Sequence, residues 1–448
     1  MSEPQQVAAQ PSDVSDPRVV LADSRMRRPQ ILIVAICVLL NALDGYDVLS
    51  ISFASPGIAS EWGVTKAALG IVLSMELIGM AAGSIVIGNL ADRFGRRPVT
   101  LACLAVMVVG MALATTSGDV TTLSVFRLFT GLGIGGMLAC TNAIVAEFSN
   151  TRSKTRAIGI MAVGYPAGAV LGGSVAAVLL EQTGSWRSVF WLGAIVAVVS
   201  IPLVWFFVPE SVGFVLQRRR GDALDAINTT LTRLGHRTVP LLPPISADEP
   251  KASVKQLFTG KLARVTILLT VAYFAHIMTF YFILKWIPKI VVDMGNSPST
   301  AAGVLVWANV GGLLGGLLLS VLSVRMNTRN LAMIGMVASV VAVIYFGTGQ
   351  NSIAGLSLVA AAVGFCTNSV VCALYALIAH SFPTSVRAGG TGFVIGVGRG
   401  GAALGPVIAG FLFQSGIGLQ GVSIAMASGS AVAAICMLLL GSTKESAL

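Results

Sequence analysis

The sequence predicts an all-α integral membrane protein whose twelve transmembrane helices form two six-helix halves. Three observations lead to this prediction. The chain of 448 residues is 55% hydrophobic but only 11% charged, whereas soluble proteins contain about 25% charged residues on average. Twelve mostly apolar runs are close to or above the length of about 20 residues that a spanning helix needs. One long polar interruption divides these runs into six and six.

Each of the twelve runs is expected to form a helix that crosses the membrane. The first six lie near residues 30–58, 66–90, 98–117, 121–147, 155–180 and 187–208. The last six lie near residues 264–291, 299–323, 330–348, 352–380, 388–414 and 418–441. The chain contains 50 glycines, and abundant glycine is typical of transmembrane helices that approach one another closely.

The domain organisation follows from these runs. An N-terminal tail (1–28), a first half (29–208), a central loop (209–263), a second half (264–442) and a C-terminal tail (443–448) are predicted. The central loop is polar and basic, and its residues near 222–234 can form a surface helix. The first apolar run is too long for the core of a signal peptide and no small-residue cleavage site follows it, so it is expected to be retained.

The net charge of +10 indicates membrane orientation rather than affinity for nucleic acid. Of the 29 lysines and arginines, only six fall outside the predicted tails and even-numbered loops: Lys66, Arg127, Arg187, Lys285, Lys289 and Arg399. Loops rich in positive charge remain in the cytoplasm. Both termini are therefore predicted to be cytoplasmic.

No cofactor or metal is expected. All six cysteines fall in predicted spans and show no metal-binding spacing, so buried, inert thiols are the preferred interpretation. No nucleophile–base pair or HExxH motif indicates an enzyme. The partner that the composition itself indicates is the lipid bilayer, and a monomer is the default for this architecture.

The loop between the second and third runs contains the most specific motif, GNLADRFGRR. Gly88 is expected to let the second helix approach a neighbour closely, and Gly95 to permit a tight turn. Asp92 can accept hydrogen bonds from a helix N-terminus or pair with arginines. Three cations are expected to hold the loop on the cytoplasmic side: Arg93, Arg96 and Arg97. The motif resembles the signature loop of the major facilitator superfamily, which implies a conformational latch; a generic basic loop is the alternative.

The corresponding loop of the second half reads SVLSVRMNTRN. When it is aligned on Arg325 and Arg329, Val324 occupies the acidic position. The second copy has therefore lost its carboxylate, and any latch in that half is expected to be weaker or built differently.

Two carboxylates lie inside the first apolar run, in the segment NALDGYDVLS. Asp44 and Asp47 are three residues apart and share one helix face, which Asn41 extends by a turn. Two carboxylates this close disfavour joint ionisation, so one of them can bind and release a proton. Ionisable residues inside a membrane often serve proton relays. Proton or substrate coupling is the preferred interpretation, and structural pairing with a basic residue is the alternative.

A first helix with the sequence DGYD, followed by this loop, resembles the aromatic acid:H⁺ symporter branch of the superfamily. The segments FRLFTGLGIGG, AEFS, WRSVF and FPTSVRAGGTGFVIGVGRGGAALGP also match, and the similarity extends along nearly the whole chain. It implies two halves with a substrate site between them near the membrane midplane. It also implies uptake of an aromatic or related carboxylate together with a proton.

The resemblance further implies roles for individual residues. The positions that matter for transport in that family correspond here to Asp44, Asp47, Asp92, Arg127, Glu147, Arg387 and Arg399. Glu147 and Arg387 are expected to belong to the conformational latch. Val324 and His380 depart from the family pattern.

Three ionisable residues in the predicted spans have open roles. Arg127 can clamp a substrate carboxylate bidentately or pair with an aspartate of the first helix. Lys285 can hold the substrate anion or extend to the outer interface beside Trp286. Glu76 can be a second proton site, pair with a cation such as Arg399, or define a substrate subgroup.

Polar and aromatic side chains complete the predicted substrate site. Asn309 and Asn368 are candidates because an amide facing lipid has no hydrogen-bond partner. Aromatic rings can stack on a planar substrate, and Tyr281 is selected because it lies near Lys285 in the sequence. The other aromatic candidates are Tyr46, Tyr165, Trp307, Tyr375 and Phe393. For each single aromatic residue, a packing or lipid-facing role is the favoured alternative.

The sequence is therefore interpreted as that of a secondary transporter that imports an aromatic or related carboxylate with a proton by alternating access. The helix-1 aspartates and Glu76 would carry the proton, while Arg127, Lys285 and Arg399 would neutralise the carboxylate. A proton-coupled efflux antiporter is less favoured because GYPAGAVLGG lacks the order of the G-P-x-x-G-G motif. Symport of a non-aromatic acid and a ligand sensor without turnover are further alternatives.

Overall fold

The computed structural model describes residues 16–219, 221–243, 254–383 and 386–441. These residues form α-helices and one short 3₁₀ helix, and no strand is found among them. Twelve helices are long and apolar enough to cross a membrane, so all twelve predicted spans are confirmed. The predicted C-terminal tail, residues 1–15 of the N-terminal tail and residues 244–253 of the central loop lie outside the described residues.

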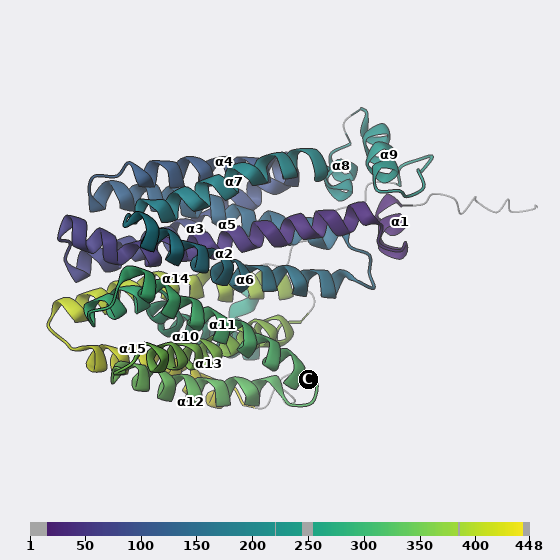
Figure 1. The fold of residues 1–448 in the computed structure, drawn as a ribbon. Helices are drawn as coiled ribbons and strands as arrows, with labels where there is room; N and C mark the ends of the chain where they lie inside the picture. The colour runs from purple at the N-terminus through teal and green to yellow at the C-terminus, as the bar shows by residue number, and fades with distance from the viewer. Residues whose placement is uncertain (1–15, 220, 244–253, 384–385, 442–448) are drawn as a thin grey trace, which may run out of the picture.

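The spanning helices form two bundles, which Figure 1 shows one above the other. The first contains α2 (Arg28–Trp62), α3 (Lys66–Phe94), α4 (Arg96–Thr115), α5 (Val120–Phe148), α6 (Lys154–Thr183) and α7 (Arg187–Phe207). The second contains α10 (Gly260–Asp293), α11 (Pro298–Leu322), α12 (Thr328–Gly347), α13 (Ile353–Ser381), α14 (Arg387–Gln414) and α15 (Leu419–Leu439). We call these bundles the first and the second half.

The ends of several spans are set by short polar caps and by glycine. The Asp119 carboxylate accepts a hydrogen bond of 2.9 Å from the backbone N–H of Thr122 at the start of α5, which satisfies one of the free amides of the first turn. α2 and α6 end at Gly63 and Gly184, whose φ angles of +59° and +64° favour glycine. These local signals explain why neighbouring spans are joined by connections of only a few residues.

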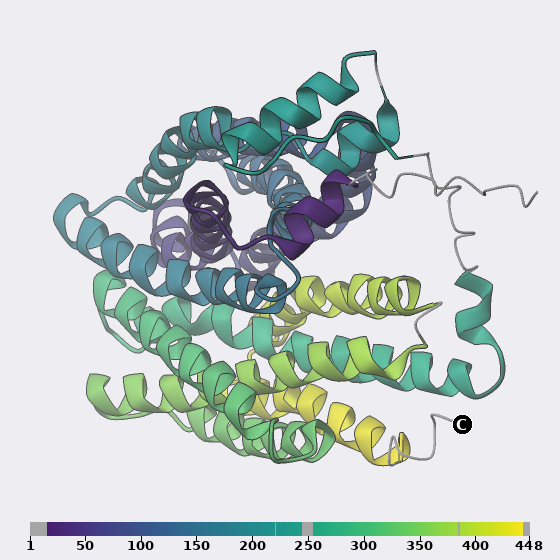
Figure 2. The ribbon, with the colours of Figure 1, turned by 90° about the vertical axis from the view of Figure 1, so that its right-hand side faces the viewer.

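Short helices mark one end of the bundles. α1 (Pro17–Asp23), α8 (Val212–Arg218) and α9 (Ala223–Arg233) gather there on the first half (Figure 1). We call this end the terminal face and the other end the opposite face. α9 confirms the surface helix expected near residues 222–234, whereas α1 and α8 were not predicted. Viewed from the terminal face, the first half lies above the second (Figure 2).

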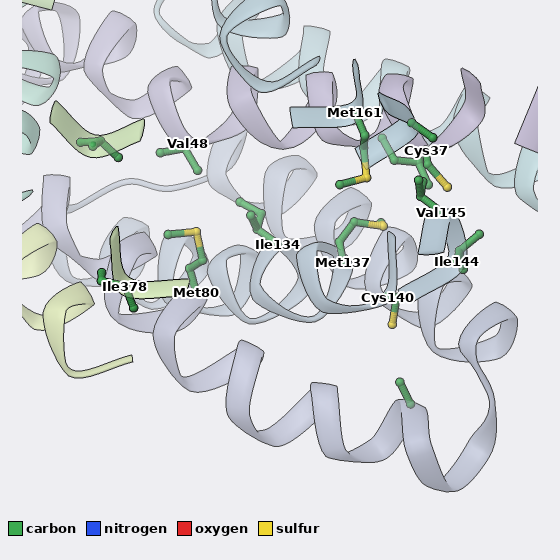
Figure 3. Close-up of a cluster of buried hydrophobic side chains, with 14 of the residues drawn as sticks. Cys37, Val48, Met80, Ile134, Met137, Cys140, Ile144, Val145, Met161 and Ile378 are labelled. Carbon is green, nitrogen blue, oxygen red and sulfur yellow. The ribbon is translucent and has the colours of Figure 1, made fainter. Parts of the chain in front are cut away.

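The short helices are packed firmly against the first half. Leu21 of α1, Leu216 of α8 and Leu231 of α9 are buried in the same hydrophobic core as the spans. Figure 3 shows part of that core, where Met137 of α5 and Met161 of α6 lie among other apolar side chains. The 3₁₀ helix η1 (Val254–Phe258) packs instead against α10 and α14 of the second half.

The two halves meet along α3 with α14, α6 with α11, and α2 with α10. Near the opposite face, the backbones come so close that a Cβ atom on Gly70 of α3 would lie 3.3 Å from the Cα atom of Gly410 on α14. The backbone N–H of Lys66 also donates a hydrogen bond of 3.1 Å to Gln414. In the described parts of the chain, every hydrogen bond or ion pair between the halves lies at the opposite face or midway along the helices.

Candidate functional site

The middle of α2 carries the two predicted carboxylates, and both are completely buried. Asp44 and Asp47 lie about one turn apart on the face that their spacing predicted. Asn41, one turn earlier, donates a hydrogen bond of 2.6 Å to the carbonyl of Met161 on α6. This polar face of α2 therefore points into the protein and not toward lipid.

Arg127 of α5 joins α2 to α3. Its Nη2 atom donates to the carboxylate Oδ1 and to the backbone carbonyl of Asp47, at 3.0 Å in each case. The same group forms an ion pair with Glu76 of α3, and the guanidinium lies 5.1 Å from the centre of the Phe190 ring. In this conformation Arg127 has the second of its two predicted roles, pairing with an aspartate of the first spanning helix.

Lys285 reaches the same place from the second half. Its Nζ atom donates a hydrogen bond to the backbone carbonyl of Val48 on α2 and lies 3.6 Å from Oε2 of Glu76. The side chain is completely buried, so the alternative that it extends to the outer interface is wrong. Glu76 is paired with Arg127 and Lys285, and the suggested pairing with Arg399 is also wrong.

We call the five buried ionisable side chains the charged cluster: Asp44, Asp47, Glu76, Arg127 and Lys285. If all five were ionised, three carboxylates would face two cations and leave one excess negative charge. An uncompensated buried charge costs several kcal/mol, so one proton on a carboxyl group gives the simplest neutral state. Asp44 is the carboxyl group with no ion pair, and neither of its oxygens has a hydrogen-bond partner within the described residues.

Tyr281 and Arg399 are the predicted substrate residues of α10 and α14. Tyr281 is one turn before Lys285 on α10, is 8% exposed, and lies close to the hydroxyl group of Tyr165 on α6. Arg399 of α14 is half-buried and forms no ion pair with the charged cluster among the described residues. Tyrosine hydroxyl groups from both halves therefore lie beside the charged cluster.

The two predicted asparagines have other hydrogen-bond partners. The Asn309 amide donates to Leu305 of its own helix at 2.9 Å. The Asn368 amide donates to Gly312 at 2.7 Å and so joins α13 to α11. Neither donates to the charged cluster: Asn309 bonds within its own helix, and Asn368 contributes to the packing of α13 on α11.

The predicted latch residues lie on the terminal face. Asp92 pairs with Arg96 at 2.6 Å, and Nε of Arg96 lies 3.6 Å from a carboxylate oxygen of Glu147 on α5. Gly95 has a φ angle of +107°, a backbone conformation that side chains other than hydrogen disfavour. Arg93 is exposed beside them. The loop between α3 and α4 is thus tied to α5 by one arginine.

Glu210, which the sequence analysis missed, also holds this loop. Its Oε1 atom accepts hydrogen bonds of 2.8 Å from the backbone N–H groups of Arg96 and Ser211. Burial raises the pKa of the Glu210 carboxyl, and the hydrogen bonds from Ser211 and Arg96 oppose this effect. The only signal in the sequence is an acidic residue directly after the sixth apolar run, and nothing there links it to a loop 114 residues away.

Gly88 does not make the close helix contact that was predicted. A Cβ atom at this position would lie 3.6 Å from Cβ of Ala139, which is an ordinary contact. The close approach of α3 to α5 occurs earlier in α3, at Gly79 and Gly83, where a Cβ atom would overlap the α5 backbone. The prediction for Gly88 was therefore wrong in position although α3 and α5 do pack tightly.

The loop between α11 and α12 corresponds to the loop between α3 and α4 of the first half. It keeps the arginine that binds the last helix of its half and lacks the ion pair of Asp92. Arg97 donates a hydrogen bond of 2.6 Å to the carbonyl of Trp205 near the end of α7, and Arg329 donates one of 2.8 Å to the carbonyl of Met437 near the end of α15. Val324, at the position of the missing carboxylate, is 84% exposed. The two halves thus share the arginine that binds the last helix of each half, but not the Asp92 pair.

Arg387 and His380 lie near the turn between α13 and α14, whose residues 384–385 are outside the described residues. Arg387 donates a hydrogen bond of 3.2 Å to the carbonyl of Phe382, and His380 is exposed in the last turn of α13. Arg387 therefore fastens its own turn in this conformation, and among the described residues it forms no hydrogen bond or ion pair with the loop of the first half.

A cavity of about 210 Å³ opens at the opposite face, away from the charged cluster. Here Lys66 lies 3.8 Å from Asp293 and 5.5 Å from the centre of the Phe413 ring. Trp286, which lines the cavity, donates a hydrogen bond of 3.1 Å to the carbonyl of Pro406. The cavity therefore lies at the place where α3 of the first half meets α10 and α14 of the second.

Comparison with known proteins gives the family. The family model described as Major Facilitator Superfamily matches residues 34–309 and 269–447. The chain belongs to the Major Facilitator Superfamily. A solved structure titled as the partially occluded inward-open conformation of the xylose transporter XylE from E. coli has the same fold, with a TM-score of 0.70 at 16% identity over 92% of this chain and 98% of that chain.

Curated relatives within the family are named as transporters of aromatic acids. The gallate transporter of Pseudomonas putida is 31% identical over 87% of each chain. The 4-hydroxybenzoate transporter of Pseudomonas putida is 30% identical over 93% of each chain. The superfamily and the aromatic-acid branch suggested by the DGYD and GNLADRFGRR segments are thus confirmed as the relatives of this chain.

Proposed function

We propose that the protein is a secondary transporter that takes up an aromatic or related carboxylate together with a proton. The observation that best supports this function is the charged cluster, which lies between the two halves and is closed off from solvent. It contains one cation from each half, Arg127 and Lys285. Ionisable groups buried at membrane depth usually serve substrates or protons, and the names of the relatives supply the substrate class.

In this proposal the substrate carboxylate binds between Lys285 and Arg127, within reach of the half-buried Arg399 on α14. Tyr281 borders the same space and can contact the aromatic ring of the substrate. The carboxyl groups of α2 and α3 hold the proton that accompanies the anion. Cations that face inward from both halves allow the anion to be bound in both orientations of an alternating-access cycle.

We further propose that the terminal face is cytoplasmic and that the protein lies in the inner membrane of a bacterium as a monomer. The basic terminal tail and even-numbered loops support this orientation. Contacts between the halves at the opposite face, such as the one between Gly70 and Gly410, then correspond to a conformation closed toward the outside. The regions 1–28, 29–208, 209–263, 264–442 and 443–448 are the tails, halves and central loop of this transporter.

In the transport cycle, we assign Asp92, Arg96 and Glu147 to a latch on the cytoplasmic side of the first half. Their ion pairs fasten the loop between α3 and α4 to α5. Gly95 and Gly88 belong to the same loop and its preceding helix, and Arg93 and Arg387 supply further charge on the same face.

The test is uptake by purified protein in vesicles with an acidic exterior. Radiolabelled gallate, 4-hydroxybenzoate, benzoate and a non-aromatic dicarboxylate are compared, and protein-free vesicles measure passive diffusion. We expect saturable uptake of at least one aromatic acid that disappears when the gradient is collapsed. Lys285→Met should abolish it, whereas Lys289→Met, one turn further along α10 and paired only with Asp293 at the opposite face, should not.

The other outcomes point to the alternatives. Uptake of the dicarboxylate alone would change the substrate class and keep the symport. Gradient-driven loss of substrate from preloaded vesicles, without uptake, would indicate an efflux antiporter. Binding without any flux would indicate a sensor and overturn the proposed function.

A further inference from the structure

We propose that Glu76 is the residue that couples proton and substrate. The substrate carboxylate replaces Glu76 beside Lys285, and a proton then neutralises the carboxylate of Glu76. Asp44, in contrast, keeps its proton throughout the cycle. One proton therefore accompanies each monocarboxylate. This inference rests on the proposed function and assigns the proton to one of three candidate groups.

Glu76 holds a special position in the charged cluster. It is the carboxylate that pairs with a cation from each half, Arg127 on α5 and Lys285 on α10. Asp47 forms its direct contacts with Arg127 of its own half. A change in the relative position of the halves must therefore alter the surroundings of Glu76 more than those of Asp47.

The contact between Glu76 and Lys285 is also the one that an anion can most easily replace. At 3.6 Å it is longer than a hydrogen bond, while Lys285 donates its close hydrogen bond to the backbone carbonyl of Val48. Glu76 keeps Arg127 when Lys285 turns to another carboxylate. The substrate therefore displaces one partner of Glu76 without removing the other.

The charge balance of the cluster sets the number of protons. With Asp44 protonated, the charges of Asp47 and Glu76 are balanced by those of Arg127 and Lys285. A bound monocarboxylate adds one negative charge to this buried space. A proton from water that forms an O–H bond on Glu76 restores neutrality, and the loaded carrier again has no net charge in its cluster.

The groups around Glu76 come from all the helices packed near it. Carboxyl groups of α2 and cations of α5 and α10 lie beside it. The charged side chains of α4, Arg96 and Arg97, lie at the terminal face. The titratable and charged groups near Glu76 on these helices are Asp44, Asp47, Arg127, Lys285, Tyr281, Tyr165 and, on α14, Arg399.

Glu76→Gln, which imitates the protonated form, tests this assignment. The substrate dissociation constant of the wild type should rise with pH, by up to about tenfold per unit for one linked proton. In Glu76→Gln it should be independent of pH. Exchange of labelled for unlabelled substrate across the vesicle membrane should remain, whereas accumulation driven by the proton gradient should be lost.

Three further variants make the result specific. In Asp44→Asn the substrate dissociation constant should still rise with pH, because the substituted group stays protonated throughout the cycle. Glu76→Asp should keep the pH dependence because it retains a carboxyl group. Glu181→Gln is the matched control, since this glutamate is exposed near the end of α6 and contacts only Ser299 across the halves.

A measurement on the wild type alone covers the case in which Glu76→Gln does not fold. Binding of 4-hydroxybenzoate or gallate in weak buffer should take up one proton per substrate, as read by a pH dye. If the wild type takes up no proton on binding, or if Glu76→Gln still accumulates substrate along the proton gradient, the role of Glu76 is overturned while transport itself stands. Failure of the wild type to bind or exchange any aromatic carboxylate would instead reject the proposed function.

Discussion

Replacing Arg127 by methionine should strongly destabilise the protein, because Arg127 is the cation with most contacts in the charged cluster. The guanidinium is completely buried and binds Asp47 twice at 3.0 Å and Glu76 once. Removing one partner of a buried ion pair costs about 3–5 kcal/mol, because the remaining charge has neither solvent nor a counterion. We expect a loss of unfolding free energy in this range at neutral pH.

Arg187→Met provides the matched control. Arg187 pairs with Glu61 at 2.7 Å, but the two side chains are 32% and 42% exposed. An ion pair that water can reach contributes about 0–1 kcal/mol. The two substitutions remove the same side chain, so the difference in their cost measures the effect of burial.

The assay is denaturant-induced unfolding of purified protein in detergent, followed by tryptophan fluorescence. In the double variant Arg127→Met/Glu76→Gln, part of the lost stability should return, because one carboxylate is removed with its cation and the single charges of Asp47 and Lys285 balance within the cluster. Lowering the pH should also restore part of the stability of Arg127→Met. If Arg127→Met were no less stable than Arg187→Met, the buried ion pairs would not exist in the resting protein.

Three further predictions test other parts of the structure. Gly410→Val inserts a side chain where α14 touches α3, so a cysteine at Leu69→Cys should be labelled faster; unchanged labelling would contradict closure at the opposite face. Gly95→Ala should cost about 1–3 kcal/mol because φ is +107°, and an unchanged melting temperature would contradict that turn. Val324→Asp should leave stability within about 0.5 kcal/mol, because Val324 is 84% exposed and Thr328 stands where the first half has Arg96; only the added change Thr328→Arg should give a salt-sensitive gain, of about 0–1 kcal/mol as for an exposed ion pair.

The fold could be predicted from the sequence because hydrophobic runs of spanning length leave few alternatives. All twelve spans lie within a few residues of their predicted bounds. The short helices α1 and α8 were missed because seven residues show too little periodicity to be recognised. Their burial depends on apolar side chains that meet only in the folded protein.

The candidate site could be predicted in part. A charged residue in an apolar run is conspicuous, so the sequence alone indicates all five members of the charged cluster: Asp44, Asp47, Glu76, Arg127 and Lys285. Their partners could not be assigned, because a sequence does not state which faces of α2, α3, α5 and α10 meet. The pairing of Glu76 with Lys285 and not with Arg399 is set by the contact of the two halves.

Glycine positions show the same limit. The turn at Gly95 was predicted from local chemistry, since a positive φ is a property of one residue. The close packing expected at Gly88 occurs at Gly79 and Gly83 instead, because helix crossing points depend on the partner helix. Glu210 was missed for the same reason, as its hydrogen bonds reach a loop distant in the sequence.

The most direct test of the account is to separate the two components of the proton-motive force. Vesicles containing the protein are given either a pH gradient or a membrane potential alone, and saturable uptake of the preferred aromatic monocarboxylate is measured above that of protein-free vesicles. One proton per anion carries no net charge across the membrane, so we predict accumulation with the pH gradient and none with the potential. Accumulation driven by the potential alone, or saturable uptake that ignores the pH gradient, would contradict the charge balance proposed for Glu76, Arg127 and Lys285.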